Sequence, residues 1–329
     1  MTATGVIGVG HLGRLHARVY SEIEDCELVG VHDVDEEAAR RVAEATGCRV
    51  FDSPDELLGA VEAVSIAVPT SAHREVAGRA IERGVHILVE KPIAATVDEA
   101  RELVEMARGA DVVLAVGHIE RMNPAVRAAL AVLTDPRFIE VHRLGVFVPR
   151  GTDVAVILDL MIHDIDLILS TVHSPVKRID AVGIPVLSPS IDIANARLSF
   201  ENGCVANVTA SRVSREKVRK VRFFQPDAYV TVDTLTPRAQ IFRRRDVPVE
   251  TLRRIASGEI EGGLEDIVEH EDLALEDAEP LRVELESFLR AVRTGGRPDV
   301  SGEDGLRALQ VAMEILTQIK TALGPGACS

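Results

Sequence analysis

The chain has 329 residues, of which 46% are hydrophobic and 27% charged, the balance of a folded protein rather than of a disordered or fibrous one. At about 150 residues per domain, this length predicts two domains. Its 37 Lys and Arg against 52 Asp and Glu give a net charge of −15, which disfavours binding to nucleic acid or to an anionic membrane. An anionic substrate would need basic side chains placed locally around it.

The four cysteines form no C-x-x-C pair, so we expect neither a disulfide framework nor a zinc cluster, and we assign no metal site. The first residues lead into an apolar segment without the basic region and cleavage site of a signal peptide. No stretch approaches the roughly 18 consecutive apolar residues of a transmembrane helix. These features favour a cytoplasmic location.

Over the first 120 residues, short apolar runs alternate with charged stretches of helical period. Runs that are apolar on both faces are typical of a parallel sheet covered by helices on both sides. The predicted strands are residues 6–9, 28–31, 63–68, 86–89 and 112–116. Helix starts are marked by the cap residues Ser53 and Thr96, and helix ends by Gly47, Gly84 and Gly109. We therefore predict a doubly wound α/β domain over residues 1–120.

The second part of the chain, residues 121–280, changes to longer alternating strands. A strand at 138–147 and a helix at 154–172 come first, and Asn202-Gly203 is a strong hairpin turn. Further strands are predicted at 194–200, 218–224, 228–232 and 239–242. The pattern predicts an α+β domain with a mostly antiparallel sheet. Residues 246–280 are acidic and predicted to be irregular, and two helices, 281–292 and 303–323, follow.

A glycine motif directly follows the first predicted strand, with the sequence Gly8-Val9-Gly10-His11-Leu12-Gly13. Its glycines allow a tight turn, close approach of a pyrophosphate and close helix packing, and the helix N-terminus attracts the phosphates. Alone, this motif is weak evidence. Asp33, at the end of the second strand, is placed to accept hydrogen bonds from the adenosine ribose, although it could be a surface residue. A carboxylate there repels a 2′-phosphate, so we predict NAD rather than NADP.

The fourth predicted strand ends in Glu90-Lys91-Pro92, at the edge of the sheet where ligands bind. Pro92 restricts Lys91 to an extended backbone and is compatible with a cis peptide bond. In the second domain, Asp159 and His163 stand four residues apart on one face of an apolar helix, which is costly unless that face is wet or paired. Taken alone, Lys91 would be a surface lysine and His163 a core histidine.

Together these motifs resemble the glucose–fructose oxidoreductase/inositol dehydrogenase/rhizopine catabolism (Gfo/Idh/MocA) family, in order and spacing, over essentially the whole chain. Residues 300–305, which lead into the last helix, are also similar. The resemblance implies a Rossmann domain, onto which the C-terminal helices 281–329 pack back. It also implies a second domain with a large open sheet that builds homodimers or homotetramers.

The resemblance places Lys91 and His163 on either side of the carbon that loses hydride. An imidazole titrates near neutral pH and can accept the hydroxyl proton, while an ammonium group can stabilise the developing alkoxide. Asp159 would position the substrate or orient the imidazole. For the cofactor, the resemblance adds Glu90 and Lys91 together with the loop Pro69, Thr70 and His73 at the nicotinamide ribose. His73 could equally be a surface helix residue.

The segments 117–126 and 159–166 are similar to those of the UDP-N-acetylglucosamine 3-dehydrogenases of this family. That branch oxidises the sugar 3-hydroxyl to a ketone on the way to the 2,3-diamino sugar of lipid A. This chain departs from it with Met122 in place of Phe and Ala155 in place of Gly. The expected substrate ligands are Arg121, Asn123, Arg143 and Arg150, besides Asp159 and His163.

Three other kinds of function stay open at this point. A polyol or free-sugar dehydrogenase of the same family would have less use for the arginines. A regulator that binds NAD without turnover would have no reason to keep both Lys91 and His163, and a glycosidase with transiently reduced NAD would release no net NADH. We therefore expect a nucleotide-sugar dehydrogenase.

Overall fold

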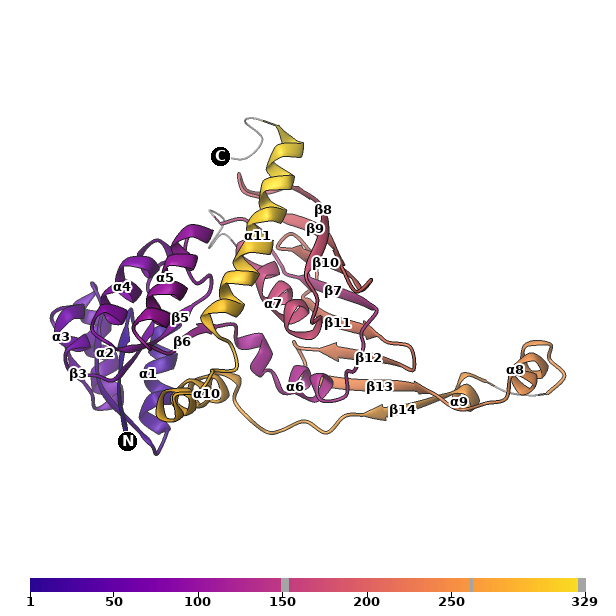
Figure 1. Ribbon diagram of the computed structural model, residues 1–329, viewed down its shortest axis with the longest axis horizontal. Helices are drawn as coiled ribbons and strands as arrows, with labels where there is room; N and C mark the ends of the chain where they lie inside the picture. Colours follow the sequence, from indigo (N-terminus) through magenta and orange to yellow (C-terminus); the bar gives the residue numbers. More distant parts are fainter. Residues whose placement is uncertain (149–153, 261–262, 325–329) are drawn as a thin grey trace. The chain divides into compact units, whose positions relative to one another are not determined.

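Figure 1 shows the computed structural model, which describes residues 1–148, 154–260 and 263–324. The chain divides into two compact units. The first comprises Met1–Met122 and Ala278–Met313, and the second comprises Asn123–Asp277 and the chain from Glu314. The last helix, α11 (Gly302–Leu323), therefore contributes residues to both units.

The first unit is built on six parallel strands in the order β3-β2-β1-β4-β5-β6. This is the strand order of a doubly wound dinucleotide-binding fold, so the predicted fold class is confirmed. The strands are β1 (Thr2–Ile7), β2 (Cys26–His32), β3 (Arg49–Val50), β4 (Ala63–Ile66), β5 (His86–Glu90) and β6 (Leu114–Gly117). The sequence pattern missed β3, because two residues are too short to show a period.

Two helices of the first unit begin where the sequence places caps. Ser53 accepts a hydrogen bond from the Glu56 N–H, and Thr96 forms a capping box with Glu99. These helices are α1 (Gly13–Glu22), α2 (Glu36–Thr46), α3 (Pro54–Leu58), α4 (Thr70–Glu82), α5 (Val97–Gly109) and, from the C-terminal part, α10 (Pro280–Thr294). Buried side chains of α10, Phe288 among them, share one core with Tyr20 of α1.

The second unit contains an eight-stranded sheet in the order β14-β13-β12-β11-β7-β10-β9-β8. β7 pairs with β10 in parallel, and the other described pairs are antiparallel, so the predicted mostly antiparallel sheet is confirmed. The strands are β7 (Phe138–Leu144), β8 (Val176–Ile184), β9 (Ile193–Phe200), β10 (Val205–Ser211), β11 (Val218–Phe224), β12 (Ala228–Asp233), β13 (Arg238–Arg244) and β14 (Val268–Asp272).

The prediction of an irregular segment over residues 246–280 was wrong in part. β14 pairs with β13 as the edge strand of the sheet, and two helices, α8 (Val249–Ala256) and α9 (Leu264–Ile267), precede it. β14 is acidic and exposed along most of its length. An edge strand with charged side chains is protected from pairing with other chains, which explains why it shows no apolar period.

One face of the second sheet carries the core of its unit. Side chains of β9 alternate between buried and outward positions, with Ala196 and Leu198 fully buried. Helices α6 (Pro124–Leu130) and α7 (Ile162–Thr171) contact strands of this sheet, α6 at β12 and β13 and α7 at β10. Among the helices that the structure describes, none is long and apolar enough to cross a bilayer.

Candidate active site

The glycine turn between β1 and α1 has the geometry of a pyrophosphate site. Gly8 adopts φ +84°, and a Cβ on Gly13 would lie 1.8 Å from the Gly8 carbonyl oxygen, so neither position accepts a side chain. At Gly10, by contrast, no described atom lies within 4 Å of the position of a Cβ. The fold itself therefore does not require a glycine at position 10, but a ligand approaching the backbone does.

The N-terminus of α1 adds a second feature that suits a phosphate. Leu12 occupies the cap position and is 44% exposed, and His11 beside it is exposed as well. Among the described residues no side chain caps α1, and its first turn holds no acidic residue. The N–H groups and partial positive charge of this helix end therefore suit the anionic part of NAD.

Asp33 lies directly after β2 and faces the glycine turn. One carboxylate oxygen accepts the Val9 N–H at 2.6 Å and the other accepts the Asp35 N–H at 2.8 Å. These bonds fix the orientation of the carboxylate at the carboxyl ends of β1 and β2. The residues present thus fit NAD: a turn for the pyrophosphate and a fixed carboxylate for the ribose.

Lys91 follows β5 at the same edge of the sheet, and the Lys91–Pro92 peptide bond is cis. The loop containing Pro92 is held by His73 of α4, whose Nδ1 lies 2.8 Å from the Pro92 carbonyl oxygen and whose Nε2 lies 2.9 Å from that of Val68. His73 is 1% exposed, so the alternative of a surface helix residue was wrong. Burial lowers the pKa of His73, although its contacts with the Pro92 and Val68 carbonyl oxygens act in the opposite direction.

Other residues of these loops lie at the same edge. Pro69 is the cap residue of α4 and is exposed, and Thr70 is the first residue of that helix. The Glu90 side chain points inward and is 9% exposed, with one oxygen 3.0 Å from His16 Nε2. Contacts of these residues with a cofactor stay predictions.

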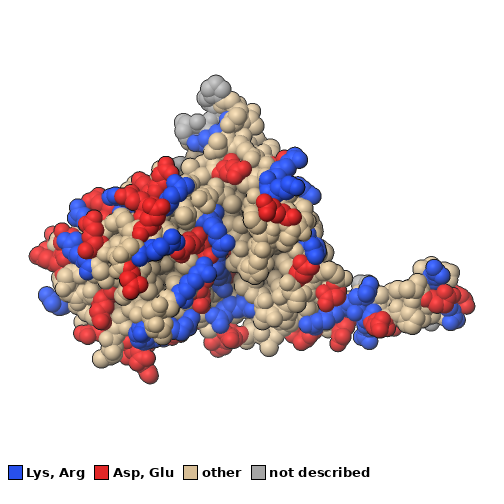
Figure 2. Space-filling model, in the orientation of Figure 1, with Lys and Arg blue, Asp and Glu red and all other residues tan. Residues whose placement is uncertain are grey.

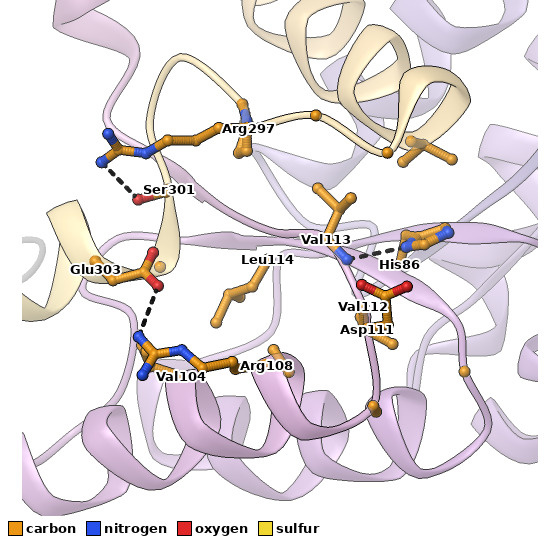
Figure 3. A pocket seen from close by; sticks show the side chains of 18 residues that line it. His86, Val104, Arg108, Asp111, Val112, Val113, Leu114, Arg297, Ser301 and Glu303 are labelled. Atoms are coloured by element: carbon orange, nitrogen blue, oxygen red, sulfur yellow. Dashed lines mark hydrogen bonds and ion pairs between the residues drawn. The ribbon is translucent and has the colours of Figure 1, made fainter.

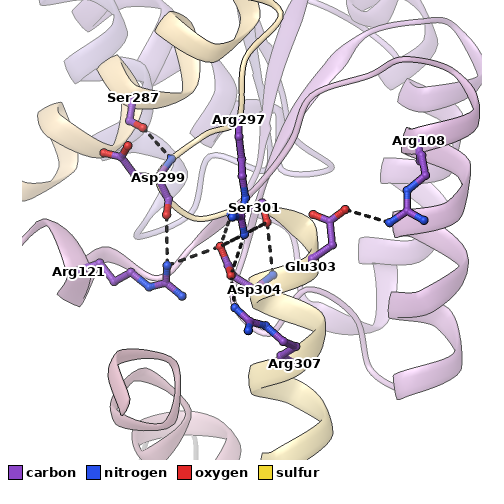
Figure 4. Close-up of polar contacts among 9 residues, drawn as sticks. All are labelled: Arg108, Arg121, Ser287, Arg297, Asp299, Ser301, Glu303, Asp304 and Arg307. Atoms are coloured by element: carbon purple, nitrogen blue, oxygen red, sulfur yellow. Dashed lines mark hydrogen bonds and ion pairs between the residues drawn. The ribbon is translucent and has the colours of Figure 1, made fainter. Parts of the chain in front are cut away.

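Arg121, in the short helix η1 (Ile119–Met122) after β6, faces the first turn of α11 (Figure 4). It donates to the Asp299 carbonyl oxygen at 3.2 Å and lies 3.5 Å from a carboxylate oxygen of Asp304. Asp304 also binds Arg297 and Arg307, at 3.0 and 2.6 Å. Arg121 therefore makes structural contacts within the first unit, which its predicted role as a substrate ligand did not include.

A pocket of about 650 Å³ lies in the first unit between the end of α5 and the segment before α11 (Figure 3). Its lining includes His86 and Leu114, the first residues of β5 and β6, together with Arg108 and Arg297. Ligands of doubly wound folds bind at the opposite edge, at the carboxyl ends of the strands. We therefore do not assign this pocket to the nucleotide.

In the second unit, Asp159 and His163 stand where a π-helical turn, η2 (Ile157–Met161), passes into α7. The predicted helix over residues 154–172 is present from residue 156, and its first part is this π-turn rather than an α-helical turn. Inserted π-turns are rare and frequent at functional sites. Asp159 and His163 are both half-buried, whereas Asp164 and Asp166 are each 1% exposed. Partial exposure suits groups that meet a substrate.

Arg143, on β7, forms a buried bidentate pair with Asp164. Its Nε and Nη2 lie 2.7 and 2.8 Å from the two carboxylate oxygens, and the two side chains are 6% and 1% exposed. This pair ties β7 to α7, the helix that carries His163. Asn123 has a structural contact as well, because it caps α6 through the Ala125 N–H. Arg150 lies outside the described residues.

Sequence reasoning missed His16 and Ser65, which contact each other behind Glu90. The sequence does place a histidine, His16, on the apolar face of α1, but the local pattern does not indicate which residues it contacts. Over the face drawn in Figure 2, acidic and basic side chains are interspersed rather than segregated. Ion pairs one helical turn apart also occur along the described helices, such as Arg40–Glu36 at 2.7 Å.

Comparisons with known proteins agree with this geometry. Residues 2–118 match the Gfo/Idh/MocA family described as an oxidoreductase family with an NAD-binding Rossmann fold, and residues 97–229 match the Gfo/Idh/MocA C-terminal domain. A relative from Acidithiobacillus ferrooxidans, named UDP-N-acetylglucosamine 3-dehydrogenase, is 41% identical over 323 residues, which are 97% of this chain and 98% of that protein.

A solved structure of the enzyme of that name and organism superposes with a TM-score of 0.88 at 39% identity, covering 98% of this chain and 99% of the other. An inositol 2-dehydrogenase from Rhizobium meliloti is 26% identical over 327 residues, which are 94% of each chain. The two family matches, the full-length identity and the glycine turn with its fixed carboxylate agree. The chain belongs to the Gfo/Idh/MocA family of NAD-binding oxidoreductases.

Proposed function

We propose that the chain oxidises the 3-hydroxyl of UDP-N-acetylglucosamine to a ketone with NAD. The observation that carries this proposal is the 41% identity, over nearly the full length of both chains, to an enzyme named for that reaction. Lys91, Asp159 and His163 supply the chemistry that such a reaction needs. NAD is anionic, in keeping with the N-terminus of α1, whose first turn holds no acidic residue.

Lys91 and His163 divide the reaction between them. His163 accepts the proton of the 3-hydroxyl, and the Lys91 ammonium donates a hydrogen bond to the same oxygen as negative charge develops on it. The C3–H bond breaks as the C3–O bond becomes a carbonyl. NAD, when bound, is the acceptor of that hydride. Asp159, on the π-turn before His163, positions the sugar or the imidazole.

The test is turnover of the purified protein with NAD, followed both by NADH absorbance and by the mass of the sugar product. UDP-N-acetylglucosamine should give NADH and a ketone two hydrogens lighter, whereas UDP-glucose, glucose 6-phosphate and myo-inositol should react far more slowly. Replacing His163 by Asn should lower kcat by about 100-fold or more and leave NAD binding intact. Turnover of free polyols alone would contradict the assigned substrate, and a cleaved sugar without net NADH would indicate a glycosidase.

We further propose that the open face of the second sheet joins copies of the chain into a homodimer or homotetramer. Aromatic rings form a row across five neighbouring strands, with adjacent centroids 4.8–5.5 Å apart, and Phe224 among them is 36% exposed. The row is formed by Phe138, Phe224, Tyr229, Phe242 and His270. Exposed aromatic surface of this kind is typical of interfaces. Replacing Phe224 by Lys should shift the sedimentation coefficient to that of a monomer, and an unchanged assembly would contradict the proposal.

For the cell, we propose a cytoplasmic reaction that feeds an aminotransferase. A 3-keto sugar is the form that accepts an amino group at C3, and the expected product is the 2,3-diamino sugar of lipid A. Incubation with a 3-keto-sugar aminotransferase and glutamate should pull the oxidation forward and consume the ketone. An aminotransferase that leaves the ketone unconsumed would contradict this step.

A further inference from the structure

A buried chain of polar side chains lies behind Lys91 in the first unit. His16 of α1 is 1% exposed, with Nδ1 3.0 Å from Ser65 Oγ and Nε2 3.0 Å from Glu90 Oε1. The Tyr20 hydroxyl lies 2.9 Å from the same Ser65 oxygen. The other Glu90 oxygen accepts the backbone N–H of Lys91 at 3.3 Å. The chain thus connects the phosphate-binding helix α1 to the backbone of the lysine.

When Nδ1 of His16 is unprotonated, these groups fit one direction of donation. An ionised carboxylate only accepts, so Nε2 of His16 carries the proton that bonds Glu90. Nδ1 then accepts from the Ser65 hydroxyl, and the Ser65 oxygen accepts from Tyr20. Each group in the series donates once. His16 therefore donates through Nε2 to the buried Glu90 carboxylate in this arrangement.

The structure also makes room for the Glu90 carboxylate. A Cβ on Gly117, the neighbouring residue on β6, would lie 2.9 Å from a Glu90 oxygen. Among the described residues, the ionisable groups around this carboxylate include His16 from α1, Lys91, His73 from α4 and Glu284 from α10. Burial raises the pKa of Glu90, but the hydrogen bond and the charge of His16, together with the charge of Lys91, bring it below its ordinary value.

We propose that His16 is a positioning residue for Lys91, acting through Glu90. By holding the carboxylate, it fixes the backbone N–H of Lys91 and keeps a negative charge beside the amine. The inference rests on the proposed function, in which that amine acts on the substrate oxygen. An ammonium form favoured by Glu90 stays charged to higher pH. The position of the alkaline limb of the kcat–pH profile therefore reports on His16.

A reciprocal pair of substitutions separates the two contacts of His16. The amide of asparagine ends where Nδ1 of histidine lies, and the amide of glutamine reaches the position of Nε2. His16→Asn therefore keeps the Ser65 contact and loses Glu90, whereas His16→Gln keeps Glu90 and loses Ser65. Tyr20→Phe is the matched control, because it removes a buried hydroxyl of the same chain without touching Glu90.

We expect His16→Asn to lower kcat about tenfold and to move the alkaline limb about one pH unit lower, with the KM for NAD changed less than about threefold. His16→Gln and Tyr20→Phe should retain the wild-type profile. Equal losses in the Asn and Gln variants, or an unmoved alkaline limb in His16→Asn, would overturn the proposal. So would a loss of NAD affinity that parallels kcat, since His16 would then act on the cofactor turn.

A second readout does not depend on the sugar. Reductive methylation with ¹³C labels primary amines, and the signals can be assigned by substitution, because besides the α-amino group they belong only to Lys91, Lys177, Lys217, Lys220 and Lys320. The amine of Lys91 should titrate about one pH unit lower in His16→Asn than in the wild type or His16→Gln. If the wild-type enzyme oxidises none of the sugars, the proposed function fails, but an unchanged Lys91 titration is still required to overturn the role of His16.

Discussion

Replacing Arg143 by Met should destabilise the second unit rather than only weaken substrate binding. The substitution leaves the Asp164 carboxylate, 1% exposed, without the two hydrogen bonds of 2.7 and 2.8 Å that Arg143 donates. Removing one partner of a buried pair typically costs about 3–5 kcal/mol, because a charge remains in the interior. Replacing both partners by apolar residues of similar volume is often neutral. Arg143→Met/Asp164→Leu should therefore recover most of the loss.

The assay is urea denaturation followed by circular dichroism, since the chain has no tryptophan to report by fluorescence. The two single variants and the double variant form a cycle, and we expect a coupling of about 3 kcal/mol between the pair. The KM for UDP-N-acetylglucosamine is measured on the same proteins. A loss below about 1 kcal/mol in Arg143→Met, together with a tenfold rise in KM, would refute this reasoning. Arg143 would then be the substrate ligand that the sequence predicts.

Gly10→Ala should fold like the wild type, because no described atom lies within 4 Å of the new methyl group, but the methyl should lower NAD affinity about tenfold, measured by calorimetry. Gly13→Ala should instead lower the melting temperature strongly, because its Cβ would lie 1.8 Å from the Gly8 carbonyl oxygen. Equal melting temperatures for Gly10→Ala and Gly13→Ala would contradict this reasoning. Asp33→Ala removes the acceptor of the Val9 N–H and should raise the KM for NAD about tenfold. It should also reduce the preference for NAD over NADP, measured as the ratio of the two kcat/KM values. An unchanged ratio would contradict the role assigned to Asp33. Burial raises the pKa of Asp304, but the Arg121 charge and the bonds around it bring the value below normal, so its stabilisation is present above about pH 4 and lost as pH falls through the lowered pKa. The free energy of unfolding of Asp304→Asn should therefore fall less steeply on acidification than that of the wild type. The same dependence on pH in both proteins would contradict this.

Much of the fold could be predicted because its signals are local. Strands apolar on both faces indicate a parallel sheet, and a cap such as Thr96 with Glu99 satisfies the helix N-terminus within four residues of sequence. β14 could not be predicted in the same way, since an exposed edge strand has no buried face to impose a period. The π-turn before His163 has no pattern of its own, because the same apolar residues fit an ordinary helical turn.

The same difference between local signals and distant contacts applies to the candidate site. The glycine turn and Lys91 could be predicted because chemistry demands particular residues directly after particular strands. The partners of a buried group depend on packing between distant segments: His16 and Glu90 are 74 residues apart. His73 shows the same limit, since its burial follows from the approach of two loops that no single window contains.

The arginines show why charge alone misleads in an acidic protein. An anionic substrate requires cations near the site, but so does every buried carboxylate of the fold. Asp164 stands in an apolar helix, where a carboxylate must be wet or paired, so the sequence did contain the need that Arg143 meets. Before an arginine is assigned to a ligand, the buried carboxylates nearby should be given their partners. By that rule Arg143 is assigned to Asp164, and Arg121 is assigned at least in part to Asp304. The cations that bind the sugar pyrophosphate must then come from the remaining basic residues.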